Sequence, residues 1–476
     1  MAKEYPLFLA GEFQKSGERL EVKNPYGGAV VGTTFLASAE QLEAAIQSAQ
    51  AAFQTTRRLP SYERERILKH IAGGIEKRKD DLARLITLQS GKPIRDAAAE
   101  VARAVLTFNT AAEESKRLGG EVIPLDWAAG SKGRLGITRR FPIGPIAGIS
   151  PFNFSLNLAA HKVAPALATG NPIILKPPSQ APLTMLDVAA LAQEAGVPKG
   201  ALSVLPMSRA LGDRLVTDDR IKMLSFTGSP PVGWDMKARA GKKKVILELG
   251  GNAGAIVDEG ADLDYAAQRL AVGSFAYSGQ ICISVQRIYV VEAVAGEFQR
   301  RFLERVRRLK VGDPLDPETD LGPMIDEEAA RRAEEWTKEA VAGGARLLAG
   351  GVRRGNIIEP TILADADPQA KVCRLEAFAP LVNLFTVKSF EEAVAQVNDS
   401  AFGLQAGVFT RDLDHALYAF RELEVGGVII NDVPLYRIDH MPYGGVKDSG
   451  YGREGLKYAM EEMTELRLMV ITEALG

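Results

Sequence analysis

Two cysteines, Cys282 and Cys373, are all that this chain of 476 residues contains. Two thiols cannot form the disulfide framework of a secreted scaffold, so we expect a reducing, cytoplasmic environment. Long apolar runs are also lacking. No stretch approaches the roughly 20 residues that a membrane span needs, and the run from Pro6 to Ala10 is too short for a signal peptide. The sequence therefore favours a cytoplasmic protein without a membrane partner.

An excess of charge of one sign is missing too. Lys and Arg number 58 against 60 Asp and Glu, which leaves a net charge of -2 and no basic footprint for nucleic acid. Histidine is scarce, and the spacing of the four present matches no metal site. They are His70, His161, His415 and His440. We expect neither a nucleic-acid partner nor a metal cofactor.

The pattern along the chain predicts two or three domains of the α/β class. Residues 64–91 have apolar residues at helical spacing, which predicts one helix ended by Gly91. From residue 145 short apolar strands alternate with helices, which predicts a parallel, doubly wound sheet with its ligand at the C-terminal strand ends. A second alternating series over 252–443 predicts another α/β domain. Residues 121–142 predict two strands around a turn.

The stretch "AYSGQICIS" places Cys282 after a flexible Ser-Gly-Gln turn. A buried structural cysteine needs only apolar neighbours. A nucleophilic one needs an exposing turn, backbone N–H groups around the sulfur and a base within reach. Both interpretations are open from this stretch alone, whereas Cys373 in "KVCRLEAF" is most simply a packing residue.

Two stretches predict a nucleotide cradle. In "SFTGSPPVG" a strand runs through Gly228 into a helix, and such a junction can receive a pyrophosphate at the helix N-terminus. The spacing from Gly228 to Gly233 is neither a Rossmann fingerprint nor a Walker A loop, and an ordinary turn fits equally. In "IILKPPSQAP" Lys176 ends a strand at the ligand side of the sheet, although a solvated lysine is the simpler explanation.

Two further residues could support chemistry at a thiol. Glu248, in "VILELGGNAG", lies in an apolar strand, where burial raises a carboxyl pKa toward the range of a general base. Asn153 follows another strand and could donate to an oxyanion. Each has an ordinary alternative, an edge-strand carboxylate and a turn residue, but together they indicate covalent thiol chemistry coupled to hydride transfer.

The sequence resembles the aldehyde dehydrogenase superfamily along essentially its whole length. The motifs that carry the resemblance occur in the family's order. They are "SPFNFSLN", "ILKPPSQAP", "FTGSPPVG", "LELGGNAGAIV", "YSGQICIS", "LEAFAPLV" and "MPYGGVKDSGYGREG".

The resemblance implies a role for each matched residue. Cys282 would attack an aldehyde, with the thiohemiacetal oxyanion held by Asn153, and Glu248 would activate the water that hydrolyses the thioester. Lys162 and Glu465 match the family's proton-relay positions. The positions that match cofactor-binding residues are Ser150, Pro151, Phe152, Lys176, Ser179, Phe226, Gly228, Ser229, Gly233, Glu376 and Phe378.

The resemblance also implies an organisation into three parts. Residues 1–120 and 143–251 would form the NAD(P)-binding domain, and residues 252–443 the catalytic domain. Residues 121–142 and 459–476 would form the oligomerisation segment of a homodimer or homotetramer.

Departures from the family pattern concern the cofactor. Ala379 replaces the usual Gly, and Phe152 the usual Trp, both mild changes. Ser179 stands where NAD-preferring members often carry Glu, whose carboxylate would bond the ribose 2′-hydroxyl and repel a 2′-phosphate. We therefore expect NADP to be accepted, alone or alongside NAD.

The C-terminal half looks most like the branch of lactaldehyde and non-phosphorylating glyceraldehyde-3-phosphate dehydrogenases. Arg103 and Arg437 lie at or near positions where that branch directs arginine to its substrate, although solvated or ion-paired arginines are an equal alternative. Ile281 replaces an arginine found in phosphate-binding relatives. The expected substrate is a small polar or anionic aldehyde. A cysteine-dependent esterase and a non-catalytic scaffold are the rival hypotheses.

Overall fold

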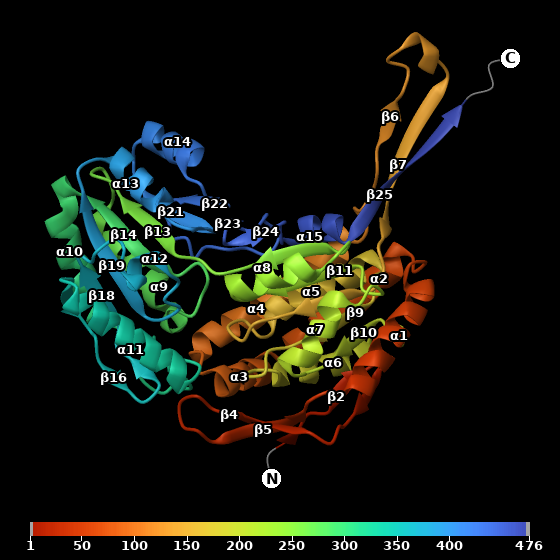
Figure 1. Ribbon diagram of the computed structural model, residues 1–476, viewed down its shortest axis with the longest axis horizontal. Coiled ribbons are helices and arrows are strands. Elements are labelled where there is room, and N and C mark those ends of the chain that lie inside the picture. Colours follow the sequence, from red (N-terminus) through yellow and green to blue (C-terminus); the bar gives the residue numbers. More distant parts are fainter. Residues whose placement is uncertain (1–2, 473–476) are drawn as a thin grey trace.

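Two open α/β sheets covered by helices form the two lobes of the molecule in the computed structural model (Figure 1). The structure describes residues 3–472. The α/β class with doubly wound sheets, predicted from the sequence, is confirmed.

The first sheet has eight strands, and its five central ones are parallel. In spatial order they are β24 (Gly450–Tyr451), β12 (Lys244–Glu248), β11 (Met223–Thr227), β8 (Ile146–Ile149), β9 (Ile173–Lys176), β10 (Leu202–Val204), β2 (Leu7–Leu9) and β3 (Glu12–Gln14). Successive residues of a strand face opposite sides. Ile173 and Leu175 accordingly join one core and Ile174 the other.

Helices cover both faces of this sheet, and α5 is buried at all 13 of its residues. They are α1 (Ala39–Thr56), α2 (Ser61–Lys77), α3 (Lys79–Ser90), α4 (Ile94–Glu114), α5 (Asn157–Thr169), α6 (Leu183–Glu194), α7 (Arg209–Thr217), α8 (Pro230–Arg239) and α15 (Leu456–Glu462). The single helix predicted over 64–91 was wrong. The chain leaves helical geometry at Arg78, within a polar run that has no apolar face to bury, while Gly91 ends α3 in the left-handed region as expected.

The second sheet has seven strands, parallel except for β15. In spatial order they are β15 (Arg346–Ala349), β18 (Thr361–Ala364), β19 (Leu381–Val387), β14 (Val285–Val291), β13 (Ala253–Val257), β21 (Gln405–Phe409) and β22 (Gly427–Ile430). Its helices are α9 (Leu263–Phe275), α10 (Glu292–Val306), α11 (Glu327–Ala342), α12 (Lys371–Arg374), α13 (Phe390–Asn398) and α14 (Leu413–Glu422).

A three-stranded sheet projects from the first lobe as an arm (Figure 1). It consists of β6 (Val122–Pro124), β7 (Arg134–Pro142) and β25 (Thr464–Thr472), joined at the tip by the short helix η1 (Ala129–Ser131). β25 pairs with β7 from Thr464 opposite Pro142 to Thr472 opposite Arg134, so the predicted hairpin and C-terminal strand lie together. The predicted C-terminal segment starts at 459, but residues 459–462 belong to α15, and residues 473–476 lie outside the described part.

Shorter elements complete the fold. β1 (Lys3–Glu4), β5 (Val30–Phe35) and β4 (Arg19–Lys23) form a small sheet, and β16 (Arg353–Arg354) with β17 (Ile357–Ile358) and β20 (Phe402–Gly403) with β23 (Val446–Lys447) form two ribbons. None of the helices within residues 3–472 has the length and apolar character that a membrane crossing requires. Within the same residues, no group of three or more His, Cys, Asp or Glu side chains is arranged to hold a metal ion.

Candidate active site

Cys282 lies in the loop between the short helix η2 (Ala276–Gly279) and β14. Tyr277, Ser278 and Gly279 all have positive φ, and a Cβ at Gly279 would lie 2.1 Å from the carbonyl oxygen of Ala379. The turn therefore requires glycine there, as the Ser-Gly-Gln pattern indicates. It leaves the Cys282 side chain half-buried beside a cavity of about 160 Å³. Burial raises the pKa of the thiol to about 12, while a hydrogen bond with Tyr443 acts in the opposite direction.

Asn153 is held against the cysteine loop. Its Nδ2 atom donates to the backbone oxygen of Gln280 at 3.0 Å, and the side chain is buried. Because an amide nitrogen carries two hydrogens, one remains for another acceptor. The structure thus places an amide donor, of the kind that stabilises an oxyanion, against the loop that carries Cys282.

Glu248 ends β12, where its side chain is 2% exposed. Neither of its carboxylate oxygens has a hydrogen-bond partner within the described residues. A Cβ at Gly444 would lie 2.9 Å from Oε1, so the carboxylate packs directly on the backbone there. Burial, and then the charge of Glu454, raise the pKa of Glu248 well above its ordinary value. An unpaired carboxyl group with a raised pKa suits proton transfer with water.

The partner of Lys162 is Glu454, and the structure does not bring Glu465, the other residue predicted for the proton relay, beside it. Lys162 Nζ lies 3.0 Å from Glu454 Oε1, and both side chains are buried. Glu465 lies instead on β25, with its side chain 55% exposed and 3.1 Å from Lys244 Nζ. The physical reason is that the chain turns back after residue 443, which brings Glu454 into the core, whereas β25 leaves along the arm. Glu454 lies within the matched motif "MPYGGVKDSGYGREG", so the sequence did contain a signal that could have indicated this residue.

The residues matched to cofactor binding gather beyond the C-terminal ends of the first sheet. Ser150, Pro151 and Phe152 follow β8, Lys176 ends β9 and Ser179 is exposed in the loop behind it. Phe226 lies in β11, Gly228 and Ser229 join β11 to α8, and Gly233 lies in α8. This is the edge at which an open α/β sheet binds its ligand.

Details of this edge fit a dinucleotide. A Cβ at Gly228 would meet the Phe226 ring at 2.5 Å, so only glycine allows the close turn. Ser229 precedes α8 without capping it, and Pro230 and Pro231 carry no N–H group, so the first turn offers a phosphate the N–H group of Val232. The buried hydroxyl of Ser150 has no hydrogen-bond partner within the described residues. The Lys176 side chain crosses α7 at Gly212.

Glu376 and Phe378 reach this edge from the second lobe. Glu376 Oε1 accepts a hydrogen bond from the Gly251 backbone at 3.0 Å, and burial raises the pKa of Glu376 to about 7. The Phe378 ring meets that of Phe152 edge to face, with centroids 5.9 Å apart. The cofactor edge and the Cys282 cavity therefore lie on either side of the junction between the lobes.

The cavity beside Cys282 contains both predicted substrate arginines. Arg437 is almost fully buried and bonds Glu454 Oε2 at 3.1 Å, while its Nε has no partner within residues 3–472. Arg103 lines the cavity but also binds Asp439 through two nitrogens, at 2.8 and 3.3 Å. The two alternatives from the sequence, a pocket residue and an ion-paired residue, thus both describe Arg103.

Buried carboxylates that sequence reasoning missed support these elements. Glu100 Oε1 accepts hydrogen bonds from the backbone N–H groups of Leu156 and Asn157, at 2.8 and 3.2 Å, at the start of α5. Its other oxygen forms a fully buried ion pair with Lys92. No motif indicated these contacts: Glu100 meets the start of α5 across 56 and 57 positions, whereas Lys92 meets Glu100 across only 8.

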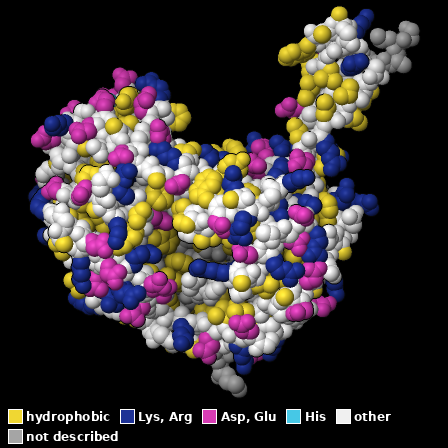
Figure 2. All heavy atoms as spheres, in the orientation of Figure 1, with side chains coloured by type: hydrophobic (Ala, Val, Ile, Leu, Met, Phe, Trp, Pro, Cys, Tyr) yellow, Lys and Arg dark blue, Asp and Glu magenta, His cyan; other side chains and the backbone are white. Residues whose placement is uncertain are grey.

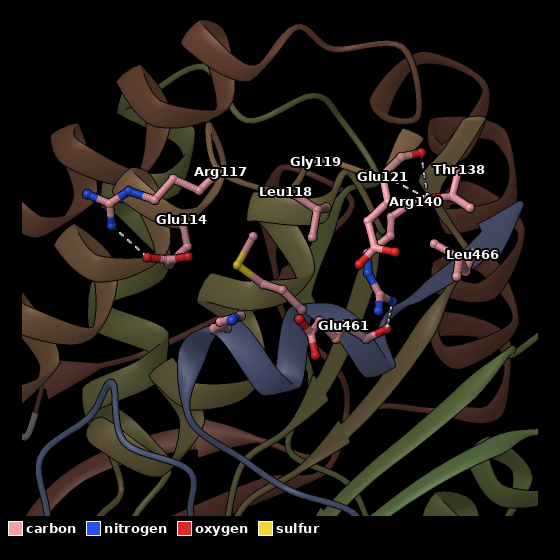
Figure 3. A pocket seen from close by; sticks show the side chains of 12 residues that line it. Glu114, Arg117, Leu118, Gly119, Glu121, Thr138, Arg140, Glu461 and Leu466 are labelled. Atoms are coloured by element: carbon pink, nitrogen blue, oxygen red, sulfur yellow. Dashed lines mark hydrogen bonds and ion pairs between the residues drawn. The ribbon is translucent and has the colours of Figure 1, made fainter. Parts of the chain in front are cut away.

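A cavity of about 300 Å³ lies away from this site, where the arm meets α4 and α15 (Figure 3). Some of its charged side chains bond within the protein: Arg117 to Glu114, and Arg140 to the backbone of Glu461. None of the residues lining this cavity is among the predicted catalytic, cofactor-binding or substrate-binding residues.

The aldehyde dehydrogenase family model matches residues 13–469. The chain belongs to the aldehyde dehydrogenase family. It is 44% identical over 470 residues to the 3-sulfolactaldehyde dehydrogenase of Priestia aryabhattai, covering 98% of both chains. This family is one of oxidoreductases, and nothing in the comparisons supports an esterase or a scaffold protein.

Solved aldehyde dehydrogenases agree with the whole fold. Aldehyde dehydrogenase 21 from Physcomitrella patens, in complex with its reaction product succinate, has a TM-score of 0.98 at 47% identity and covers 100% of this chain and 99% of its own. Glyceraldehyde-3-phosphate dehydrogenase GapN from Methanocaldococcus jannaschii, complexed with NADP, has a TM-score of 0.92 at 41% identity and covers 97% and 100%. NAD(P)-dependent aldehyde oxidation is thus the activity of this family member.

Proposed function

We propose that this enzyme oxidises a small aldehyde that carries a distal anionic group to the corresponding carboxylic acid. The observation that carries the proposal is the unpartnered Nε of buried Arg437 in the cavity that also holds the Cys282 sulfur. A buried guanidinium without a full set of acceptors favours a carboxylate, sulfonate or phosphate. Sulfolactaldehyde, succinate and glyceraldehyde-3-phosphate, named for the relatives, each carry such a group.

The reaction follows from the positions of this chain's own residues. We assign attack on the aldehyde carbon to Cys282 Sγ, which gives a thiohemiacetal whose oxygen the Asn153 amide and the Cys282 backbone N–H hold. A nicotinamide dinucleotide held at the ends of the first sheet and by Glu376 and Phe378 would supply the hydride acceptor, and the acyl group would remain on Cys282 Sγ as a thioester. Glu248 takes a proton from the water that hydrolyses this thioester. Lys162 and Glu454 keep a charged, hydrogen-bonded path beside Glu248.

The distal anion is tested by replacing Arg437 with Met and comparing an anionic aldehyde with a neutral one of equal length. The ratio of their kcat/KM values should fall about 100-fold, because a buried charge partner is lost only for the anion. Arg453→Met is the matched control, since Arg453 does not line the cavity and should leave the ratio unchanged. Wild-type enzyme that prefers long alkyl or bulky aromatic aldehydes would contradict the proposal.

We further propose that NADP is accepted as cofactor. Exposed Ser179 presents no carboxylate to a 2′-phosphate, and Lys176 has its pKa lowered by burial and by the nearby charge of Arg209. Introducing the carboxylate as Ser179→Glu should lower kcat/KM for NADP at least about tenfold through like-charge repulsion, and affect NAD less. Gln180→Glu adds the same charge one residue away and serves as the control. Wild-type enzyme without any NADP turnover would refute the proposal that NADP is accepted.

We also propose a homo-oligomer assembled through the arm. β25 is an edge strand with exposed apolar side chains, and Figure 2 shows apolar side chains gathered on the projecting arm. Exposed apolar edge strands favour pairing with another chain. Leu468→Glu with Val470→Glu should dissociate the assembly in size-exclusion chromatography with light scattering, whereas Tyr62→Glu, on α2, should not. A wild-type mass of 51.3 kDa would mean a monomer and end this proposal.

We also propose that the first lobe binds the cofactor, that the second lobe carries catalysis and that the arm serves oligomerisation. A cytoplasmic location is part of the same proposal. Support for the division comes from where the sheets, the Cys282 loop and β25 lie.

A further inference from the structure

The hydroxyl of Tyr443 contacts the reactive sulfur. Its oxygen lies 3.2 Å from Cys282 Sγ, and the tyrosine is 3% exposed. Among residues 3–472 this sulfur is the only hydrogen-bond partner of the hydroxyl. A buried phenol that donates to a sulfur and to no other group is placed to hold charge on that sulfur.

No imidazole performs this role. His161 Nε2 lies 2.7 Å from Asp439 and is held away from the thiol. The side chains that act on the pKa of the thiol are Tyr443 through its hydrogen bond, and Glu376, Arg437 and Glu248 through their charges. The two carboxylates disfavour a thiolate, while Tyr443 and Arg437 favour it. Tyr443 is the one of the four that touches the sulfur directly.

Arg437 strengthens the phenol as a donor. Its guanidinium carbon lies 3.6 Å from the centroid of the Tyr443 ring. A cation over an aromatic face draws electron density from the ring, which makes the attached hydroxyl a better donor. Glu454 holds this arrangement from two directions, since it bonds Arg437 Nη2 at 3.1 Å and exchanges two backbone hydrogen bonds with Tyr443.

We propose that Tyr443 is a catalytic residue, whose hydroxyl donates a hydrogen bond to the Cys282 thiolate and so raises the fraction of the nucleophile that is ionised. The inference rests on the proposed function only in taking Cys282 as the nucleophile. Tyr443 keeps its own proton throughout, and the proton that the thiol loses passes to solvent water. The residue therefore sets how much thiolate is present and performs no proton transfer.

The expected effect has two opposing parts. Removing a hydrogen bond to a charged acceptor lowers the thiolate fraction about tenfold at a given pH. The remaining thiolate is more basic and about threefold more reactive, because nucleophilicity rises with roughly the 0.4–0.5 power of basicity. A Tyr443→Phe variant should thus react about threefold more slowly than wild type at neutral pH and about threefold faster at the alkaline plateau. Damage to the fold alone would not produce curves that cross.

The experiment follows alkylation of Cys282 by iodoacetamide against pH, with full-length free enzyme and peptide-level mass spectrometry to separate Cys282 from Cys373. Tyr443→Phe should move the midpoint to higher pH and raise the plateau. Tyr277→Phe is the matched control. Tyr277 belongs to the same apolar cluster as Tyr443, but its hydroxyl donates to the Ser90 backbone oxygen at 3.2 Å and does not bond the thiol. Its midpoint should equal that of wild type. Superimposable curves for Tyr443→Phe and wild type would overturn the inference.

If Tyr443→Phe does not fold, 3-fluorotyrosine at position 443 provides a test of opposite sign. Its more acidic phenol should move the midpoint to lower pH, and an unmoved midpoint would overturn the inference. Aldehyde-dependent NAD(P)H formation is measured on the same preparations. A shifted midpoint in an enzyme that oxidises no anionic aldehyde would uphold the role of Tyr443 and reject the proposed function, so the two can fail separately.

Discussion

Replacing Cys282 with Ser is expected to lower NAD(P)H formation by at least about 10⁴-fold, the scale on which loss of a catalytic nucleophile acts. A serine hydroxyl fills the same space and can still bond Tyr443, but it does not ionise in a site without a strong base at hydrogen-bond distance. The loss should appear in kcat, whereas the affinity for the dinucleotide, measured by fluorescence titration, should stay near that of wild type.

Cys373→Ser is the control for this substitution. Cys373 is 4% exposed, and it packs in a separate apolar cluster with Val372 and Leu381. It should retain near-wild-type turnover, with stability reduced by burial of a hydroxyl. If instead Cys282→Ser kept full NAD(P)H production, the covalent mechanism and the assignment of the active site would both be wrong.

The fold was largely predictable because its signals are local. Short apolar strands alternating with helices, as at Ile146–Ile149 and Ile173–Lys176, indicate a parallel sheet by themselves. The Ser-Gly-Gln stretch likewise predicted the turn before Cys282, where the structure has positive φ at Tyr277, Ser278 and Gly279. Each of these patterns depends on neighbours within a few residues.

The charged interior was not predictable in the same way. Lys162 meets Glu454 across 292 positions, and His161 meets Asp439 across 278. The spacing of residues along the chain does not indicate such a pair. A carboxylate that directly follows an arginine, as Glu454 follows Arg453, suggests a local ion pair at the surface instead. The prediction for Glu465 came from matching family positions, and the structure places this residue on β25, which leaves the core along the arm.

Tyr443 shows the same limit at closer range. Its motif, "MPYGGVKDSG", supported only the family resemblance, and the sequence pattern does not indicate that the tyrosine hydroxyl contacts the Cys282 sulfur. The packing of Arg437 on its ring depends on a turn that the Tyr443–Glu454 bridge creates. The chemistry of this site thus depends on contacts between residues far apart in the chain, as between Cys282 and Tyr443.

Replacing Glu248 with Gln is expected to separate the two halves of the reaction. Attack by Cys282 and the reduction of NAD(P) in the first turnover need no base at Glu248. A burst of about one NAD(P)H per active site should therefore remain in stopped-flow absorbance. Steady-state turnover should fall about 10² to 10⁴-fold, because thioester hydrolysis loses its general base. A variant that lacks the burst would place Glu248 in the acylation half instead.

The same substitution makes a prediction for stability. Burial raises the pKa of Glu248 in the folded protein, so between the ordinary carboxyl pKa and this raised value the folded state holds a proton that the unfolded chain has released. Stability of the wild type therefore falls as pH rises through that window. Gln releases no proton, so Glu248→Gln should be increasingly more stable than wild type across the window and should show no such gain below it. Thermal unfolding at several pH values tests this, with exposed Glu462→Gln on α15 as the control. An equal change in Tm for both variants at every pH would show that Glu248 is not held protonated by burial.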